Sequence, residues 1–402
     1  MATPVHELDL PTIELLGIED REQIVAAFEA VADKHWLARM PLGYSVMRHA
    51  DVVAILRDKR FHSAISMIPQ MGGVSDDFLA NRQESILTME GEPHARLRRL
   101  VAPAFTPKAA DRLRPFMRDV VNGLLDDYQP KGRGDFVQEI CEPYPIPIIC
   151  ELLGAPKDDW KLFSGWATDI FRIFNGDLQN DAPKIVAAFR AVDEYVRELI
   201  AERRDKPADD LLSDLIAAEE AGDRLSTDEL VMMTEAVLMA GTDTTRNQLA
   251  CAVALFTEHP EQWARLAEHP ELAPKAVEES MRYLGAVRGT ARLASEDIEY
   301  REVVFPQGTL VVTSLAGANF DPNAFADPHR FDIQRDSSAP QMTFGSGIHH
   351  CLGASLARAE LQEALPIVAR RLGPIEVDGQ IEWKPSTAGI WGPARLPLRW
   401  SV

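Results

Sequence analysis

The chain has 402 residues, 46% of them hydrophobic, and carries a formal net charge of −20 at pH 7. A chain of this length can bury a sizeable core, either as one large domain or as two or three average ones. The acidic charge argues against nucleic acid as a partner, because binding to phosphates needs a basic face.

The cysteine pattern and the N-terminal residues indicate the cellular compartment. Cys141, Cys150, Cys251 and Cys351 form no CxxC pair, no zinc-type spacing with histidine and no secreted disulfide framework. The first residues contain neither a basic nor an apolar signal region, and no stretch approaches roughly 18 apolar residues. We therefore expect a monomeric, cytoplasmic protein that does not enter a membrane.

Helical periodicity dominates long parts of the chain. It predicts helices over residues 21–34, 107–128, 136–154, 158–174, 184–204, 227–258, 261–268, 271–284 and 355–371. Short runs punctuated by Gly and Pro predict strands near residues 43–47, 298–304, 309–313 and 381–399. There is no internal repeat and no long linker, so residues 1–402 are expected to form a single, mainly α domain: a large helical body with small β-sheets at its edge.

The longest predicted helix, 227–258, contains the run AGTDTT at residues 240–245. Ser226 or Thr227 can serve as the N-cap, and the helix ends before Pro260. A glycine followed by β-branched and polar residues weakens a helix where its propensity should sustain it. The run is either a tolerated polar turn of the helix or a place where function overrides local preference.

Near the C-terminal end, the run FGSGIHHCLG at residues 344–353 places Cys351 just before the helical run 355–361. The positive end of a helix favours a charged sulfur, and the glycines let the backbone approach a flat ligand. Taken alone, the cysteine could equally be an inert buried residue. The loop resembles the haem-binding loop of the cytochrome P-450 family in its Phe, two glycines, His, Cys and closing Gly.

Further motifs follow in the order found in that family. The run at 240–245 resembles its distal-helix motif, and Glu279-Ser280-Met281-Arg282 resembles the Glu-x-x-Arg of its K helix. Pro328-His329-Arg330-Phe331 resembles its Pro-x-Arg-Phe element, while residues 94–100 resemble its C helix. The resemblance runs from about Gly43 to Pro397.

The resemblance implies a soluble bacterial-type haem-thiolate monooxygenase with haem b, in which Cys351 is the axial ligand. It implies that one atom of O₂ is inserted into an apolar small organic substrate, by hydroxylation or oxidative dealkylation. Thr244 and Asp243 would deliver protons, Gly241 would leave room for O₂, and Glu279, Arg282 and Arg330 would form a buried network. The propionates and the ring would meet His94, Arg98, Arg292, His349, Phe344 and Gly353.

Electrons would come from a ferredoxin with its NAD(P)H-dependent reductase, since the chain has no flavin or nicotinamide fingerprint. Arg96, Arg99 and Arg358 lie on segments that face the electron donor in the family, although Arg96 and Arg99 could be ordinary solvated helix charges. A haem-thiolate peroxygenase or isomerase, and a non-catalytic haem protein, are alternative interpretations. The retained Asp243 and Thr244 pair favours the monooxygenase.

The sequence does not identify the substrate. Segments 62–88, 168–188, 285–291 and 386–392 would carry specificity, and none indicates a substrate. Helical spacing and the C-terminal turn predict a pocket lined by Met233, Ala236, Ala240, Val287, Arg288, Gly389 and Ile390, most of which could equally be core. If Arg288 points inward, it implies an anionic or strongly accepting substrate group; otherwise it turns toward the propionates or the pocket rim and pairs with an acidic side chain.

Overall fold

The computed structural model describes residues 2–14, 21–65, 85–174, 178–220, 225–337, 339–385 and 389–402. The substrate-specificity segments predicted above therefore lie partly outside the described residues, at 66–84, 175–177 and 386–388.

Helices make up most of the described chain. The α-helices are α1 (Arg21–Ala32), α2 (His49–Arg57), α5 (Gly91–Val101), α6 (Pro107–Tyr128), α7 (Pro145–Leu153), α8 (Trp160–Phe171), α9 (Leu178–Asp205), α10 (Leu211–Glu220), α11 (Thr227–Glu258), α12 (Pro260–Glu268), α13 (Ala273–Tyr283), α14 (Leu315–Asn319) and α15 (Ala354–Leu372). A π-helix over Val137–Cys141 precedes α7.

The strands are short and form small sheets. They are β1 (Thr3–Pro4), β2 (Leu37–Met40), β3 (Gly43–Val46), β4 (Phe61–Ser63), β5 (Arg133–Asp135), β6 (Gly289–Ala294), β7 (Ile298–Tyr300), β8 (Val303–Phe305), β9 (Leu310–Ser314), β10 (Ile375–Val377), β11 (Glu382–Trp383), β12 (Pro393–Arg395) and β13 (Pro397–Trp400). The largest sheet has the order β2-β3-β9-β6-β4, and β13 lies between β10 and β5 in another.

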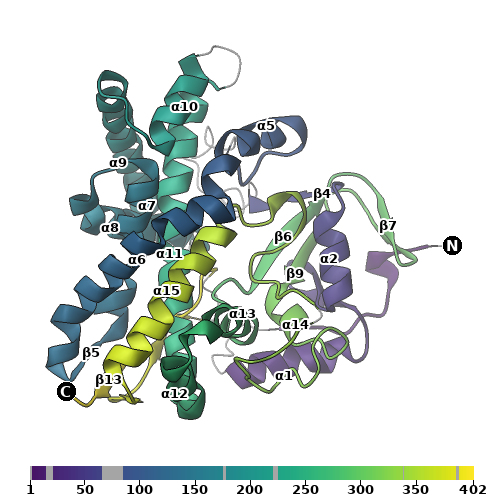
Figure 1. Ribbon diagram of the computed structural model, residues 1–402. Helices are drawn as coiled ribbons and strands as arrows, with labels where there is room; N and C mark the ends of the chain where they lie inside the picture. The colour runs from purple at the N-terminus through teal and green to yellow at the C-terminus, as the bar shows by residue number, and fades with distance from the viewer. Residues whose placement is uncertain are drawn as a thin grey trace.

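The helices gather on one side of the molecule and the largest sheet on the other (Figure 1). The N-terminus lies at the sheet end and the C-terminus beside β13 at the opposite end of the helical body. The predicted mainly α fold with small sheets at its edge is confirmed.

Helix α11 forms the axis of the helical body, and α15 and α6 pass in front of it in Figure 1. Its side chains are buried on nearly every face, which is the pattern of a helix inside a core rather than at a surface. Ser226 and Glu229 form a reciprocal capping box at its N-terminus, and this satisfies two otherwise unpaired backbone N–H groups.

The predicted bounds of α6 and α11 agree with the structure, because both helices are long and strongly patterned. The expected weakening at residues 240–245 does not interrupt α11. Periodicity alone missed α2 and α10, and it missed strands of two to four residues such as β4 and β5. Strands this short contain too few alternating positions to be detected. No helix among the described residues has the length and apolar character to cross a membrane.

Candidate active site

The loop that carries Cys351 turns back on itself before α15. Phe344 O accepts a hydrogen bond from the Cys351 N–H at 2.9 Å, and Ala354 N–H donates to Cys351 O at 3.4 Å. Gly347 adopts a φ of +75°, and a Cβ there would collide with the main chain of Leu56 on α2. This glycine is therefore required both by its conformation and by the close approach of α2.

Burial raises the pKa of the Cys351 thiol, whereas the Gly353 N–H, Arg98 and Arg358 act in the opposite direction. The Gly353 N–H hydrogen-bonds to the sulfur, while the Ala354 N–H bonds to the Cys351 carbonyl oxygen instead. A cation bound to the sulfur would oppose the effect of burial and favour the thiolate.

Cationic side chains from separate elements converge beside this loop. Arg98 on α5 donates to His350 O at 2.5 Å, and Arg292 on β6 donates to Ala291 O at 2.9 Å. Burial lowers the pKa of both guanidinium groups. Neither guanidinium has a carboxylate at ion-pair distance among the described residues, so an anionic ligand here would stabilise both charges.

Two histidines complete this cluster. The rings of His94 and His349 lie 4.6 Å apart, and His349 Nε2 lies 3.0 Å from Glu90 Oε1. His94 is 3% exposed, and its Nε2 is buried without a hydrogen-bond partner. A buried, unsatisfied ring nitrogen is unusual, and it identifies a position where a ligand oxygen is expected.

On the facing helix, α11, the side chains with solvent access recur every four residues. Ala236, Ala240 and Thr244 belong to this row, and Met232 begins it. Met233 needs correction as a pocket residue: it is 2% exposed and packs in the main hydrophobic core, two turns of α11 before the accessible Ala240.

Gly241 and Thr244, two of the predicted site residues within 240–245, each make a contact inside the protein. A Cβ at Gly241 would lie 3.0 Å from two side-chain carbons of Ile149, so this glycine lets α11 pack closely against α7, and it remains partly exposed. The Thr244 hydroxyl donates to Ala240 O at 3.0 Å within the helix, which leaves its lone pairs free.

The Asp243 carboxylate is buried and surrounded by cations. Arg246, one turn along α11, forms a close ion pair with its Oδ1, and Lys384 Nζ lies 3.8 Å from the same atom. Arg246 also lies 3.8 Å from Glu142 Oε1. Asp243 therefore connects, through Arg246, to a carboxylate that is 36% exposed.

The segment after α13 contacts the C-terminal hairpin, which is formed by β11 and β12. Val287 and Ile390 pair in an isolated antiparallel bridge, which brings these two predicted pocket residues together. The Arg288 guanidinium lies 4.8 Å above the ring of Trp391, and that ring stacks on Trp383 at 4.6 Å. Burial lowers the pKa of Arg288 to about 10. Stacking on Trp391 is therefore one of the contacts that hold this arginine.

Comparison with known proteins gives a consistent result. A model of the cytochrome P450 family matches residues 158–372. Luteothin monooxygenase of Streptomyces thioluteus is 38% identical over 416 residues, covering 100% of both chains. Nocardicin C N-oxygenase of Nocardia uniformis subsp. tsuyamanensis is 37% identical over 90% of this chain and 91% of its own. The crystal structure of CalO2 superposes with a TM-score of 0.90 at 30% identity, covering 98% of this chain and 99% of that one.

The chain belongs to the cytochrome P450 family. Like other members, it is a monooxygenase that uses haem b with a cysteine thiolate as axial ligand, and it takes O₂, an organic substrate and electrons from a redox partner. The residues present fit this cofactor. The unsatisfied His94 Nε2, the half-buried Arg98 and the buried Arg292 suit the two propionates, because neither arginine has a carboxylate at ion-pair distance among the described residues, and Cys351 suits the iron.

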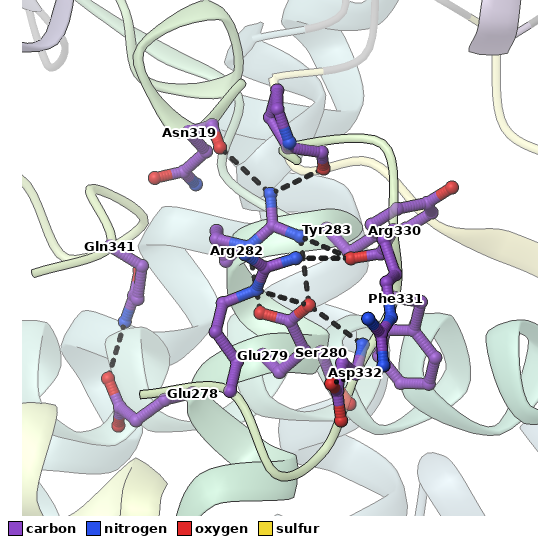
Figure 2. A network of polar contacts seen from close by, with 12 residues as sticks. Glu278, Glu279, Ser280, Arg282, Tyr283, Asn319, Arg330, Phe331, Asp332 and Gln341 are labelled. Atoms are coloured by element: carbon purple, nitrogen blue, oxygen red, sulfur yellow. Dashed lines mark hydrogen bonds and ion pairs between the residues drawn. The ribbon is translucent and has the colours of Figure 1, made fainter. Parts of the chain in front are cut away.

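A buried ionic network of this cytochrome P450 is built around Glu279 and Arg282 on α13 (Figure 2). Arg282 makes a bidentate pair with Glu279 at 2.8 and 2.9 Å and donates to the main-chain oxygens of Asn319 and Pro328. Asn319 Oδ1 in turn accepts from the Met342 N–H at 2.7 Å, two residues before Phe344. The network thus joins α13, α14 and the approach to the Cys351 loop.

The third arginine of this network is not the expected one. The Arg330 side chain is 69% exposed and pairs with Asp332 at 3.0 Å, and only its carbonyl oxygen enters the network. Arg335 instead places its Nε 3.0 Å from Glu279 Oε1, with its side chain 12% exposed. The chain turns between these two positions, so the later arginine is the one that reaches the buried carboxylate.

The arginines expected to face the redox partner are all paired in this P450. Arg96 pairs with Glu229, Arg99 with Glu92 and Arg358 with Glu278. Arg358 also lies 4.5 Å from the ring of Phe344. Arg57 on α2, absent from the predicted set, donates to Ser346 of the Cys351 loop at 3.1 Å and is exposed.

Several of these residues could not be identified from the sequence. Glu90, Lys384 and Arg335 belong to no distinctive run, and each becomes relevant only when the fold brings it to a partner far away in the chain. The sequence does contain a signal for Arg246. It stands three residues after Asp243 on a predicted helix, and residues at this spacing are neighbours on the helix surface.

Proposed function

We propose that this cytochrome P450 hydroxylates or oxidatively dealkylates a small, mainly apolar organic substrate, using electrons from a ferredoxin and its NAD(P)H-dependent reductase. The observation that carries the proposal is the acid and alcohol pair Asp243 and Thr244 on α11, retained in a chain with an intact Cys351 loop. An enzyme that only isomerised its substrate or consumed peroxide would not need this pair for proton delivery.

Binding of the haem is assigned to residues from four parts of the chain. Cys351 would hold the iron, while Arg98 and Arg292 would neutralise the propionates, and His94 and His349 would hydrogen-bond to them. Phe344 and Gly353 would line the proximal side. Glu90, which accepts from the Ser63 N–H at 2.6 Å as well as from His349, would orient that histidine. When bound, the haem supplies the oxidising chemistry.

Thr244 and Asp243 would divide the proton chemistry between them. The Thr244 hydroxyl would exchange its hydrogen bond to Ala240 O for one to the oxygen site, and the Asp243 carboxylate would bring the next proton from outside. Small side chains at Ala236 and Ala240 leave space beside Thr244, and Val287 and Ile390 add apolar surface. Such lining favours binding of an apolar substrate.

Recognition of a substrate anion by Arg288 is less well supported than recognition of an apolar group. The stacking of its guanidinium on Trp391 already stabilises the positive charge. We therefore infer that Arg288 buttresses the contact between the segment after α13 and the C-terminal hairpin.

The test is turnover by the holoenzyme with a ferredoxin system and a substrate found by spin-state titration. Thr244→Ala should leave substrate affinity within about twofold but divert most electrons to peroxide or water, because proton delivery becomes disordered. Asp243→Asn should slow turnover. Unchanged coupling of NADH oxidation to product in both variants would remove these residues from the reaction and contradict the proposal.

A further inference from the structure

A hollow of about 500 Å³ opens between α1 and α14, and none of its described lining residues belongs to the Cys351 loop. The two helices lie one above the other at the foot of the sheet side in Figure 1. The inner surface of this outer hollow is apolar and includes Phe28, Met47 and Phe320. Binding sites for drug-sized ligands have volumes of about 300–1,000 Å³, so the outer hollow can hold a whole small organic molecule.

Charged side chains also line the outer hollow, and carboxylates predominate among them. Glu29, Asp33 and Asp321 are acidic, whereas Arg48 carries the one guanidinium among the described lining residues. His329 Nε2 lies 2.5 Å from Glu29 Oε1, and even with that pair set aside the carboxylates outnumber the guanidinium. An excess of negative charge disfavours an anionic ligand, so the outer hollow suits an organic molecule that is neutral or cationic.

A narrower cavity, the neck, continues from the outer hollow toward the reaction site. Three residues line both cavities: Val25, Ala316 and Phe320. The neck is also lined by Val287, Arg288 and Trp391, and Val287 pairs with Ile390, so it ends beside the proposed substrate pocket. Its volume is about 40 Å³. This is room for a few water molecules but not for the ligand that the outer hollow can hold.

The main chain around the inner end of the neck is fixed by hydrogen bonds. The Trp391 N–H donates to Ala286 O at 2.9 Å, and the Ala316 N–H donates to Arg288 O at 2.9 Å. The Arg288 guanidinium stacks 4.8 Å above the Trp391 ring, and such a contact is of modest strength. An arginine side chain has several rotatable bonds, so its rotation can widen the neck while the main chain stays in place.

We propose that the outer hollow is an entrance chamber for a neutral or cationic organic substrate, and that the Arg288 side chain on Trp391 is the gate between this chamber and the reaction site. The continuity of the two cavities carries the inference, because residues of the neck also border the proposed pocket. The inference rests on the proposed function, since it assumes an organic substrate that binds beside Val287 and Ile390.

The test measures how fast a ligand enters and leaves the holoenzyme. The probe is 4-phenylimidazole at about pH 8, where an imidazole is uncharged; it binds haem iron and shifts the Soret band. Val25→Trp and Ala316→Phe fill the neck from opposite walls. Ala26→Trp adds the same indole at an exposed position of α1 and is the matched control.

Both filling variants should slow association and dissociation of the probe by about tenfold, with Kd unchanged within about twofold, because an obstructed route raises the barrier equally in both directions. Ala26→Trp should exchange the probe at the parent rates. Arg288→Ala should accelerate both rates, because it removes the gate. Adding Arg288→Ala to Val25→Trp should restore little of the lost rate, because the obstruction remains in series with the opened gate.

Parent-like rates in both filling variants would show that ligands enter elsewhere, and the inference would be wrong. A Kd that changed as much as the rates would assign Val25 and Ala316 to the binding site itself and would equally contradict an entrance chamber. Should one filling variant not fold, the other decides, because it starts from the opposite wall. Failure of the proposed function would look different: the probe would exchange as predicted, but no coupled turnover would be found with any organic substrate.

Discussion

At the residue scale, the chemistry of this P450 depends on buried groups whose charge is set by the protein around them. His94 Nε2 has no hydrogen-bond partner, and neither Arg98 nor Arg292 has a carboxylate at ion-pair distance among the described residues. Asp243, in contrast, already has two cations beside it, Arg246 and Lys384. In our proposal the first group of residues binds the propionates and Asp243 delivers a proton.

Glu360 is a third buried group, and it allows a test that does not depend on catalysis. It lies on α15, 2% exposed, and burial raises its pKa to about 8, although a hydrogen bond with Thr245 of α11 opposes this. Because the folded state binds this proton more tightly than the unfolded state, stability is greatest below the unfolded pKa and falls as pH rises towards 8.

We therefore expect Glu360→Gln, which keeps a similar shape without ionising, to unfold at a temperature that falls less steeply between about pH 5 and pH 8 than that of the parent. Thermal unfolding followed by circular dichroism would measure this. Glu363→Gln, which removes a partially exposed partner of Arg114 and Arg118, is the control and should not flatten the curve. Parallel pH dependence in the parent and Glu360→Gln would contradict the assignment of a neutral Glu360.

At the element scale, α11 combines two functions on different faces. Its partly exposed row includes Ala236, Ala240 and Thr244, while most of its other residues are buried in the core. The two functions can be separated by substitutions at Ala240 and Met233, because Met233 lies seven residues, about 10 Å, earlier along the helix axis and is buried in the core.

Ala240→Leu should obstruct the space beside Thr244 and weaken the spin-state response to bulky ligands, with little change in stability. Met233→Ala should do the reverse and lower the free energy of unfolding by about 2–5 kcal/mol, because it leaves a cavity in the core. Ligand titrations and denaturant unfolding of both variants would measure the contrast. If Met233→Ala altered ligand affinity as strongly as Ala240→Leu, the placement of the row would be wrong.

Elements were predictable from the sequence in proportion to their length. The extents of α6 and α11 followed from periodicity over many residues, and the Cys351 loop followed from a dense motif. The third arginine of the Glu279 network could not be identified in this way, because Arg330 and Arg335 differ only in how the chain turns between them. Glu90 and Lys384 could not be identified either, because each makes its contact with a residue far away in the chain, and no local pattern encodes such a contact.

At the scale of the whole molecule, a strongly acidic chain has to receive electrons at a site buried beneath the Cys351 loop. Arginines from three elements contact this loop: Arg57 on α2, Arg98 on α5 and Arg358 on α15. A positive area limited to this face could orient an acidic ferredoxin while the rest of the surface repelled it.

We expect Arg57→Gln to slow reduction by ferredoxin at low salt, whereas Arg96→Gln and Arg358→Gln should have smaller effects, because Glu229 and Glu278 already neutralise these arginines. Stopped-flow reduction at several ionic strengths would measure this, and the salt dependence of the parent should shrink in Arg57→Gln. Substrate affinity should be unchanged. Identical reduction rates at low salt would place the docking surface elsewhere.

The most direct test of the account concerns Cys351 itself. Purified parent protein, reduced and exposed to carbon monoxide, should give the red-shifted Soret band of a thiolate complex. Cys351→Ser should remain folded and largely helical but lose this band together with oxygenase activity, because a serine oxygen is a harder ligand and a poorer electron donor than a thiolate. Persistence of the thiolate-type spectrum in Cys351→Ser would contradict the assignment of the ligand and, with it, the site built around it.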